Sequence, residues 1–140
     1  MDTAYDVFIS FNWKDRTKIR SVDKYLCRGG LTTFMAERDL TDIGSKSIYP
    51  EAYEALTLSQ VFLAAVGSNG IGGSQLREIE RANQSKRLKY NLLLSGIKPQ
   101  NIPSYLEDNP SFIFPASRYS KKSKGLKELV DEIKRQANLT

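Results

Sequence analysis

The apolar stretch that decides the fold is Tyr5-Asp6-Val7-Phe8-Ile9-Ser10-Phe11. Its β-branched and aromatic side chains follow one another without the strict polar alternation of a half-exposed strand, so it predicts a strand that is buried on both faces. Strands of that kind occur in parallel sheets whose two faces are covered by helices. The rest of the chain should therefore alternate strands with helices.

The segments that follow do alternate in this way. Helices are predicted at 16–27, 50–58, 74–86 and 124–136, and further strands at 31–35, 61–66, 90–94 and 111–114. Gly29-Gly30 is expected to end the first helix, Pro50 to open the second, and Asp15 to be the N-cap of the first. The pattern predicts one α/β domain over residues 1–140: a three-layer, flavodoxin-like domain with a five-stranded parallel sheet in the order 2-1-3-4-5.

Sheets of this kind bind ligands at the carboxyl ends of their strands, at the switch point between the first and third strands. Three loops should meet there: 11–15, 36–46 and 67–74. The polar stretch 36–47 is predicted to be a loop that is longer than a connector needs, which is typical of a functional segment.

Two glycine-containing stretches could be mistaken for phosphate-binding motifs. The stretch 67–73 lacks the spacing of the dinucleotide fingerprint, and Gly44-Ser45-Lys46-Ser47 lacks the earlier glycine and the Gly-Lys-Ser junction of a Walker A loop. A conventional dehydrogenase or nucleoside triphosphatase is therefore not expected.

The chain contains no histidine, and this limits its chemistry more than any other feature of its composition. Mechanisms that need Ser-His-Asp, Cys-His or a histidine acid–base are excluded, as are most zinc sites. We expect no metal and no resident cofactor, so that any chemistry must use carboxylates, hydroxyls or lysines. The single cysteine, Cys27, lies beside Leu26 near the end of the first helix and is expected to be a small core residue.

The 21 Lys and Arg residues exceed the 16 Asp and Glu residues, and the excess lies just before or early in the last predicted helix. Because no interleaved aromatics or nucleic-acid motif accompany these charges, they predict a solvated helix face and no direct nucleic-acid partner. No apolar stretch is long enough to cross a bilayer, and the first residues do not resemble a signal peptide. We expect a cytoplasmic protein without membrane contact, and a lone cysteine fits such a reducing compartment.

Three segments, in order along the chain, resemble the signature boxes of TIR (Toll/interleukin-1 receptor) domains. Residues 5–11 resemble the first box, 34–44 the second strand with the BB loop after it, and 67–79 the end of the third strand with the helix that carries the family's catalytic glutamate. The resemblance covers essentially the whole chain, and the compact loops are closest to those of prokaryotic NAD-cleaving members. Some members of the family are scaffolds, and others cleave NAD+ to nicotinamide and ADP-ribose or its cyclic relatives.

The resemblance implies that Glu78 is the catalytic residue, in about the first turn of its helix. Cleavage of the nicotinamide–ribose bond generates an oxocarbenium-like centre, whose charge a carboxylate can stabilise while it holds the ribose hydroxyls. Nicotinamide leaves as a neutral group, so the reaction needs neither a general acid nor a raised carboxylate pKa. The alternative for Glu78 is an acidic first-turn residue that complements the helix dipole. Glu80 is expected to lie at the surface.

The resemblance also implies substrate-binding residues in the first two loops. Phe11 and Asn12 match first-box positions that line the family's nucleotide pocket, although Phe11 fits equally well as the end of a buried strand. Asp42 and Lys46 match BB-loop positions that contact the substrate or a neighbouring subunit, and a charged, exposed loop is the alternative.

One position departs from the family's catalytic pattern. Ser74 is included among the substrate-binding positions because many catalytic members have a tryptophan there, four residues before the glutamate, whose ring packs on the nucleotide. Loss of that ring removes stacking energy, and Trp13 in the first loop is a candidate to replace it. Arg38 and Asp39 are expected to form a local ion pair in the BB loop.

Together these features predict an NAD+ glycohydrolase or cyclase that is activated by assembly and acts in prokaryotic, antiphage immune signalling. The expected partners are NAD+, other TIR domains through the BB loop at 37–46, and a sensor domain or protein in cis or in trans. The alternative is a non-catalytic TIR scaffold. A flavodoxin-like receiver or nucleotide-binding domain fits the topology, but the chain lacks the acidic pocket and the phosphorylatable aspartate that receivers have after the third strand.

Overall fold

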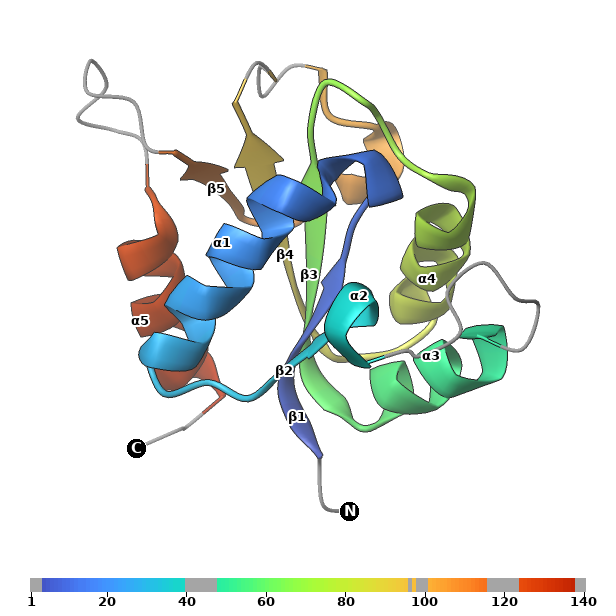
Figure 1. Cartoon of the computed structure of the whole chain (residues 1–140), viewed down its shortest axis with the longest axis horizontal. Coiled ribbons are helices and arrows are strands. Elements are labelled where there is room, and N and C mark those ends of the chain that lie inside the picture. Colours follow the sequence, from blue (N-terminus) through green and yellow to red (C-terminus); the bar gives the residue numbers. More distant parts are fainter. Residues whose placement is uncertain (1–3, 40–47, 96, 98–100, 116–123, 138–140) are drawn as a thin grey trace.

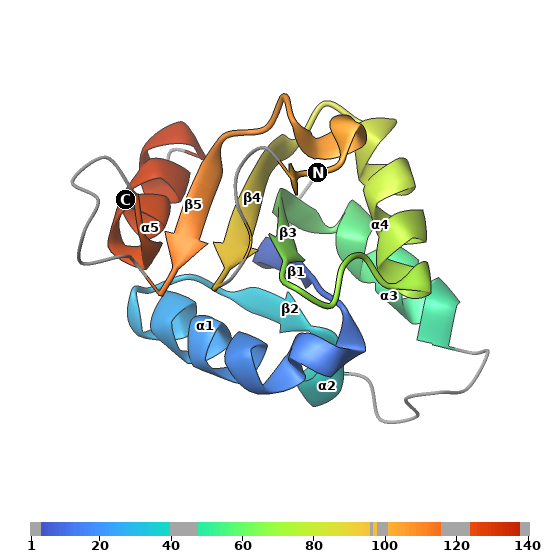
Figure 2. The ribbon, with the colours of Figure 1, turned by 90° about the horizontal axis from the view of Figure 1, so that it is seen from above.

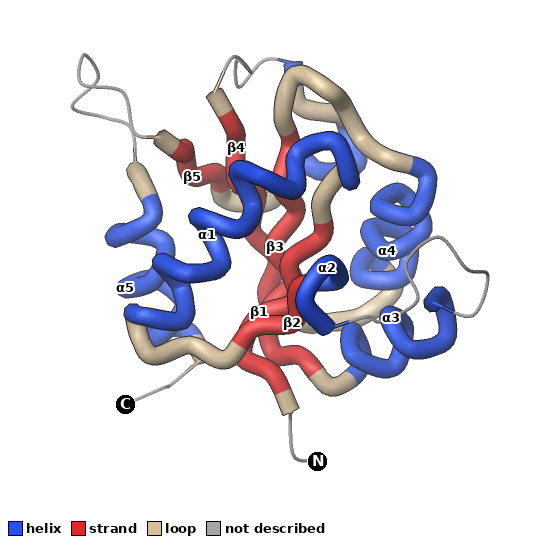
Figure 3. Tube along the Cα trace, in the orientation of Figure 1, coloured by secondary structure: helices blue, strands red, loops and turns tan. Residues whose placement is uncertain are grey.

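Five parallel strands form the centre of the protein, in the order β2-β1-β3-β4-β5. The structure is a computed structural model, and it describes residues 4–39, 48–95, 97, 101–115 and 124–137. The strands are β1 (Tyr5–Ser10), β2 (Thr33–Met35), β3 (Ser59–Val66), β4 (Leu88–Leu94) and β5 (Ser111–Phe114) (Figure 3). The predicted fold class and strand order are confirmed.

Helices cover both faces of this sheet. They are α1 (Arg16–Arg28), α2 (Ala36–Asp39), α3 (Ile48–Thr57), α4 (Gly73–Asn83) and α5 (Leu126–Gln136), with the 3-10 helices η1 (Trp13–Asp15) and η3 (Ser104–Leu106). The helices α1 and α5 lie on one face, and α3 and α4 lie on the other (Figures 1 and 2). The domain is therefore a three-layer sandwich, and both faces of the central strands are buried.

The side chains of β1 alternate between the two cores on either side of the sheet. Val7 and Ile9 pack with the residues of α1 and α5, whereas Phe8 packs with those of α3 and α4. All three are at most 1% exposed, which explains why the strand lacks a polar face. Ser10 comes two residues after Phe8, so it should face the α3 and α4 side, and its contacts described below agree.

One prediction about α1 is confirmed and one is wrong. Asp15 is the N-cap residue of α1 as predicted, although its buried side chain makes no capping hydrogen bond. Cys27 is exposed and is not a core residue, because the inward stripe of α1 consists of Ile19, Val22 and Leu26 and the next residue projects away from that stripe. The Cys27 sulfur lies 3.4 Å from the hydroxyl of Thr33.

The predicted loop at 36–47 is wrong at its beginning, since residues 36–39 form the short helix α2. Two other boundaries also differ from the predictions. The helix α3 begins at Ile48, so Pro50 lies within its first turn, where the missing backbone N–H has no consequence. The helix α4 begins at Gly73 and ends at Asn83, shorter than the predicted 74–86.

Candidate active site

Ser10 and Glu78 meet at the carboxyl end of β1. The hydroxyl of Ser10 donates a hydrogen bond of 2.7 Å to Oε1 of Glu78, which α4 carries. Ser10 is fully buried, and Glu78 is partly exposed. The helix begins at Gly73, so Glu78 lies in its second turn and not in the first. A dipole-complementing role at the helix end therefore explains this residue poorly, because that effect is confined to the first turn.

The surroundings of Glu78 change its acidity. Burial raises the pKa of this carboxyl to about 7, and the hydrogen bond from Ser10 opposes that rise by stabilising the charged form. The carboxyl therefore changes between its neutral and charged forms near neutral pH. Such a group can stabilise a positive centre, accept hydrogen bonds from hydroxyls or transfer a proton.

Ser10 is the residue of this candidate site that the sequence interpretation missed. The signal was available: Ser10 is a hydroxyl at the last position of an otherwise apolar strand, on the same face as Phe8. A polar side chain at the carboxyl end of a central parallel strand points to a binding edge. Its partner on α4, however, is 68 positions away along the chain.

Asn12 and Asp15 fasten the first loop to the turn between β3 and α4. The amide of Asn12 donates to the carbonyl oxygens of Asn69 (3.1 Å) and Gly70 (3.3 Å), and its Oδ1 accepts from the backbone N–H of Lys14. Asp15 accepts a 2.7 Å hydrogen bond from the side chain of Asn69. Asn12 thus joins its own loop to the 67–74 loop, which is expected to be adjacent at the switch point, and these contacts give it a structural role there.

Phe11 points away from the Glu78 side of the sheet. It packs against the core formed with α1 and α5, and its ring stacks on that of Trp13 with 6.2 Å between the centroids. The guanidinium carbon of Arg16 lies 5.4 Å from the centroid of the Trp13 ring. These contacts hold both rings at the beginning of α1, so they do not support Trp13 as a replacement for a ring at position 74.

The exposed side of α4 carries the remaining residues of interest. Ser74 is exposed one turn before Glu78, and Glu80 is exposed as predicted. A side chain at position 74 and the Glu78 carboxyl share one face of the helix, because residues four apart are neighbours on an α-helix. Asp42 and Lys46, the predicted BB-loop contacts, lie outside the described residues.

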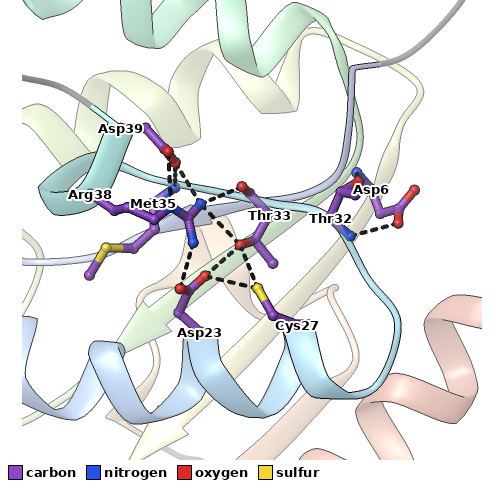
Figure 4. A network of polar contacts seen from close by, with 8 residues as sticks. All are labelled: Asp6, Asp23, Cys27, Thr32, Thr33, Met35, Arg38 and Asp39. Carbon is purple, nitrogen blue, oxygen red and sulfur yellow. Dashed lines mark hydrogen bonds and ion pairs between the residues drawn. The ribbon is translucent and has the colours of Figure 1, made fainter.

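A network of polar contacts holds the residues that lead into the BB loop (Figure 4). Arg38 donates to Asp23 of α1 (Nη1–Oδ2, 2.6 Å), to the carbonyl of Thr33 (2.5 Å) and to Asp39 (Nη2–Oδ2, 2.6 Å). Asp39 in turn accepts from the backbone N–H of Met35 (2.8 Å). The hydrogen bond to Asp39, followed by the charges of Asp23 and Asp39, raises the pKa of Arg38. The predicted Arg38–Asp39 pair is confirmed, and Asp23 extends it to the first helix.

Neither a metal-binding cluster nor a membrane-spanning helix is found in the part of the chain that the structure describes. There, no three Cys, Asp or Glu side chains come together in a way that could hold a metal ion. Within the same residues, each helix is too short or too polar to cross a bilayer.

A comparison of the sequence with models of protein families matches residues 7–130 to the TIR domain. The chain belongs to the TIR domain family. The match begins within β1, includes Arg38, the Gly67–Gly73 turn and Glu78, and ends within α5. A search of the curated proteins finds no match.

Solved structures show the same TIR fold. A TIR-STING receptor from C. gigas in complex with 2′,3′-cGAMP superposes with a TM-score of 0.70 at 17% identity, over 94% of this chain and 40% of that one. Another structure of a C. gigas TIR-STING receptor gives 0.64 at 19% identity, over 99% and 41%. The TIR domain of the Toll-related receptor TRR-2 from Hydra magnipapillata gives 0.59 at 18% identity, over 79% and 85%. The chain thus spans about 40% of the length of the TIR-STING receptors.

Proposed function

We propose that this TIR domain is an NAD+ nucleosidase, a glycohydrolase or cyclase that cleaves the bond between nicotinamide and ribose. The observation that carries the proposal is the Glu78 carboxyl, held by Ser10 at the carboxyl end of β1 beside the switch point of the sheet. Parallel α/β sheets bind their ligands at this edge. The TIR family includes members that cleave NAD+, and the resemblance of residues 67–79 to the family's box supports Glu78 as the counterpart of its catalytic glutamate.

In the proposed reaction, the bond between ribose C1′ and the nicotinamide nitrogen breaks, and its electron pair stays with nicotinamide, which leaves neutral. The positive charge that develops on the ribose is stabilised by the charged form of Glu78. Attack by water on C1′ gives ADP-ribose and a proton, whereas attack by an atom of the same nucleotide gives a cyclic product. Ser10 holds Oε1 of Glu78, and in the proposed reaction Oε2 contacts the substrate.

Assembly and control belong to the same proposal. We propose that other TIR domains bind through the BB loop at 37–46 and that a sensor, in cis or in trans, switches on an immune, antiphage response in a prokaryotic cytoplasm. The TIR-STING receptors support the proposal of a sensor. This domain matches only about 40% of their length, so their chains contain a further part, and one of the two structures is a complex with 2′,3′-cGAMP.

The test incubates concentrated protein with NAD+ in the presence of a crowding agent. Chromatography then measures the nicotinamide that is released. Wild type should release nicotinamide, whereas Glu78→Ala and Glu78→Gln should lose nearly all activity. Glu80→Gln is the matched control, because Glu80 is an exposed carboxylate on the same helix and should keep wild-type activity. Equal activity in wild type and both Glu78 variants would contradict the assigned role.

A non-catalytic TIR scaffold is the second candidate, and Ser74 is the observation that favours it. A serine there offers no aromatic face on which a nucleotide could stack. If wild-type protein that has assembled into oligomers releases no nicotinamide from NAD+, the scaffold is favoured.

A further inference from the structure

The side-chain amide of Gln75 is buried at the point where β1 and β3 separate. Gln75 is 1% exposed, and its Nε2 donates to the carbonyl oxygen of Ser10 in β1 (3.1 Å) and to that of Ala65 in β3 (2.7 Å). Its Oε1 accepts from the backbone N–H of Gly72 (3.2 Å). The two carbonyls can only accept and the N–H can only donate, so the partners themselves define the orientation of the amide.

Gln75 supplies hydrogen bonds to both strands at the point where the hydrogen bonding between β1 and β3 ends. The last pair in the β1–β3 register is Ser10 with Ala64, and Ala65 is the next residue of β3. Buried carbonyl oxygens need a partner, and at this edge an α4 side chain supplies it. The bond to Gly72 ties the same side chain to the N-terminus of its own helix, as the third helical residue does in a capping box.

Ser10 is consequently held by α4 at two points. Its carbonyl oxygen accepts from Gln75, and its hydroxyl donates to Glu78. Gln75 and Glu78 are three residues apart, and residues at that spacing are neighbours on one face of a helix. The first contact therefore determines how far α4 can rotate or slide relative to β1, and with it the geometry of the second contact.

We propose that Gln75 is a positioning residue that holds the Glu78 carboxyl against Ser10 in the geometry that cleavage requires. The inference rests on the proposed function for its catalytic part, and on the contacts of β1, β3 and α4 for its structural part. Gln75 acts through Ser10 and the helix, not through contact with the nucleotide. A residue that merely filled the core would change the stability of the domain but not the properties of the carboxyl.

The test compares Gln75→Met, which keeps the length of the side chain and removes all three hydrogen bonds, with Gln84→Met, a control at the exposed end of the same helix. The first readout is the 13C NMR titration of the Glu78 carboxyl, assigned by comparison with Glu78→Gln. In Gln75→Met we expect the pKa of Glu78 to fall from about 7 toward the ordinary 4.5. A loosened helix admits water, and the loss of desolvation outweighs the smaller, opposite effect of a weakened hydrogen bond from Ser10. Gln84→Met should titrate as the wild type does.

The second readout is the kinetics of NAD+ cleavage. Gln75→Met should lower kcat by about tenfold to a hundredfold while KM changes by less than about threefold, since small misplacements of reacting groups carry losses of that size. Gln75→Asn keeps an amide on a shorter side chain and should fold even where the methionine variant does not. It should shift the titration and kcat in the same direction by a smaller amount.

Loss of the positioning role and absence of NAD+ cleavage give different results. If Gln75→Met and Gln75→Asn lower the melting temperature but leave the Glu78 titration and kcat equal to those of Gln84→Met, the positioning role is overturned. If wild type itself does not cleave NAD+, the proposed function fails, and the titration alone then decides the structural part. A shifted Glu78 titration in the Gln75 variants supports that part, and an unchanged titration overturns it.

Discussion

The hydroxyl of Ser10 and the carboxyl of Glu78 form a 2.7 Å hydrogen bond between the end of β1 and the second turn of α4. The two residues are 68 positions apart in the sequence, and the parallel sheet brings them together at its carboxyl edge. This contact and the burial of Glu78 act on the carboxyl in opposite directions.

Replacement of Ser10 by alanine tests the role of this hydrogen bond. The hydroxyl stabilises the charged carboxyl, so in Ser10→Ala the pKa of Glu78 should rise above its wild-type value of about 7. If NAD+ cleavage needs the charged form, activity at pH 7 should fall roughly threefold to tenfold and recover at higher pH. Initial rates of nicotinamide release from pH 5.5 to about 9 measure the shift. Ser21→Ala, on the exposed side of α1, is the control, and a profile of Ser10→Ala that coincides with that of the control would contradict the prediction.

The pKa of Glu78 also predicts how stability depends on pH. A carboxyl whose pKa rises from 4.5 in the unfolded chain to about 7 in the folded one binds more protons when folded, so the free energy of unfolding decreases as pH rises through that window. The variant Glu78→Gln, which has no charge there, should gain about 2 to 3 kcal/mol relative to wild type between pH 5 and pH 8. Urea denaturation of both proteins at the two pH values measures this difference. A difference that does not change with pH would show that Glu78 titrates normally.

The exposed Ser74 is the position at which a ring should increase activity. Ser74 lies one turn before Glu78 on the same helix face. In Ser74→Trp the indole should stack on a nucleotide base, a contact that is generally worth about 1 to 3 kcal/mol, and so raise kcat/KM for NAD+. Ser74→Leu adds bulk without an aromatic face and is the matched control. Unchanged or reduced turnover in the tryptophan variant would show that the missing ring does not limit the site.

The ion pair between Asp23 and Arg38 should be stronger than an ordinary surface pair. The side chain of Asp23 is 12% exposed, that of Arg38 is 42% exposed, and their atoms are 2.6 Å apart. We expect a coupling of about 1 to 2 kcal/mol in a double-mutant cycle of Asp23→Asn and Arg38→Met, reduced from the value of a fully buried pair by the exposure of the arginine. The pair of Glu132 and Arg135, whose side chains are 25% and 68% exposed, is the comparison and should give less than about 0.5 kcal/mol. Equal couplings for the two pairs would contradict this account of the network.

Two glycines near α4 should respond oppositely to alanine. A Cβ at Gly67 would lie 3.2 Å from Oδ2 of Asp15 and from Cδ1 of Leu94, whereas a Cβ at Gly73 would meet nothing within 4 Å. Gly67→Ala should therefore lower the free energy of unfolding by about 1 to 2 kcal/mol, since it forces packed groups apart. Gly73→Ala should raise it by about 0.5 to 1 kcal/mol, because alanine favours the helix and restricts the unfolded chain. Chemical denaturation of both variants tests the pair, and similar losses in both would contradict the prediction.

Most of the fold could be predicted from patterns within short segments of the sequence. The continuous apolar stretch 5–11 predicted a strand buried on both faces, and Val7, Phe8 and Ile9 are at most 1% exposed. Predictions failed where one turn of helix or one side-chain direction had to be chosen. Examples are α2 at Ala36–Asp39 and the exposed Cys27, since local propensity for these features is weak and packing decides them.

The sequence by itself determined the alternation of strands and helices, their order in the sheet and the position of Glu78 on the helix after β3, because periodicity and glycine punctuation are local properties. The tertiary structure decided which groups surround that carboxyl. The hydroxyl of Ser10, the amide of Gln75 and the burial that raises the pKa of Glu78 to about 7 all depend on α4 packing against β1. The contacts of Ser10 with Gln75 and Glu78 join residues that are 65 and 68 positions apart, and such contacts leave no periodic pattern in the sequence. Desolvation of the Glu78 carboxyl arises only when the helices have packed against the sheet.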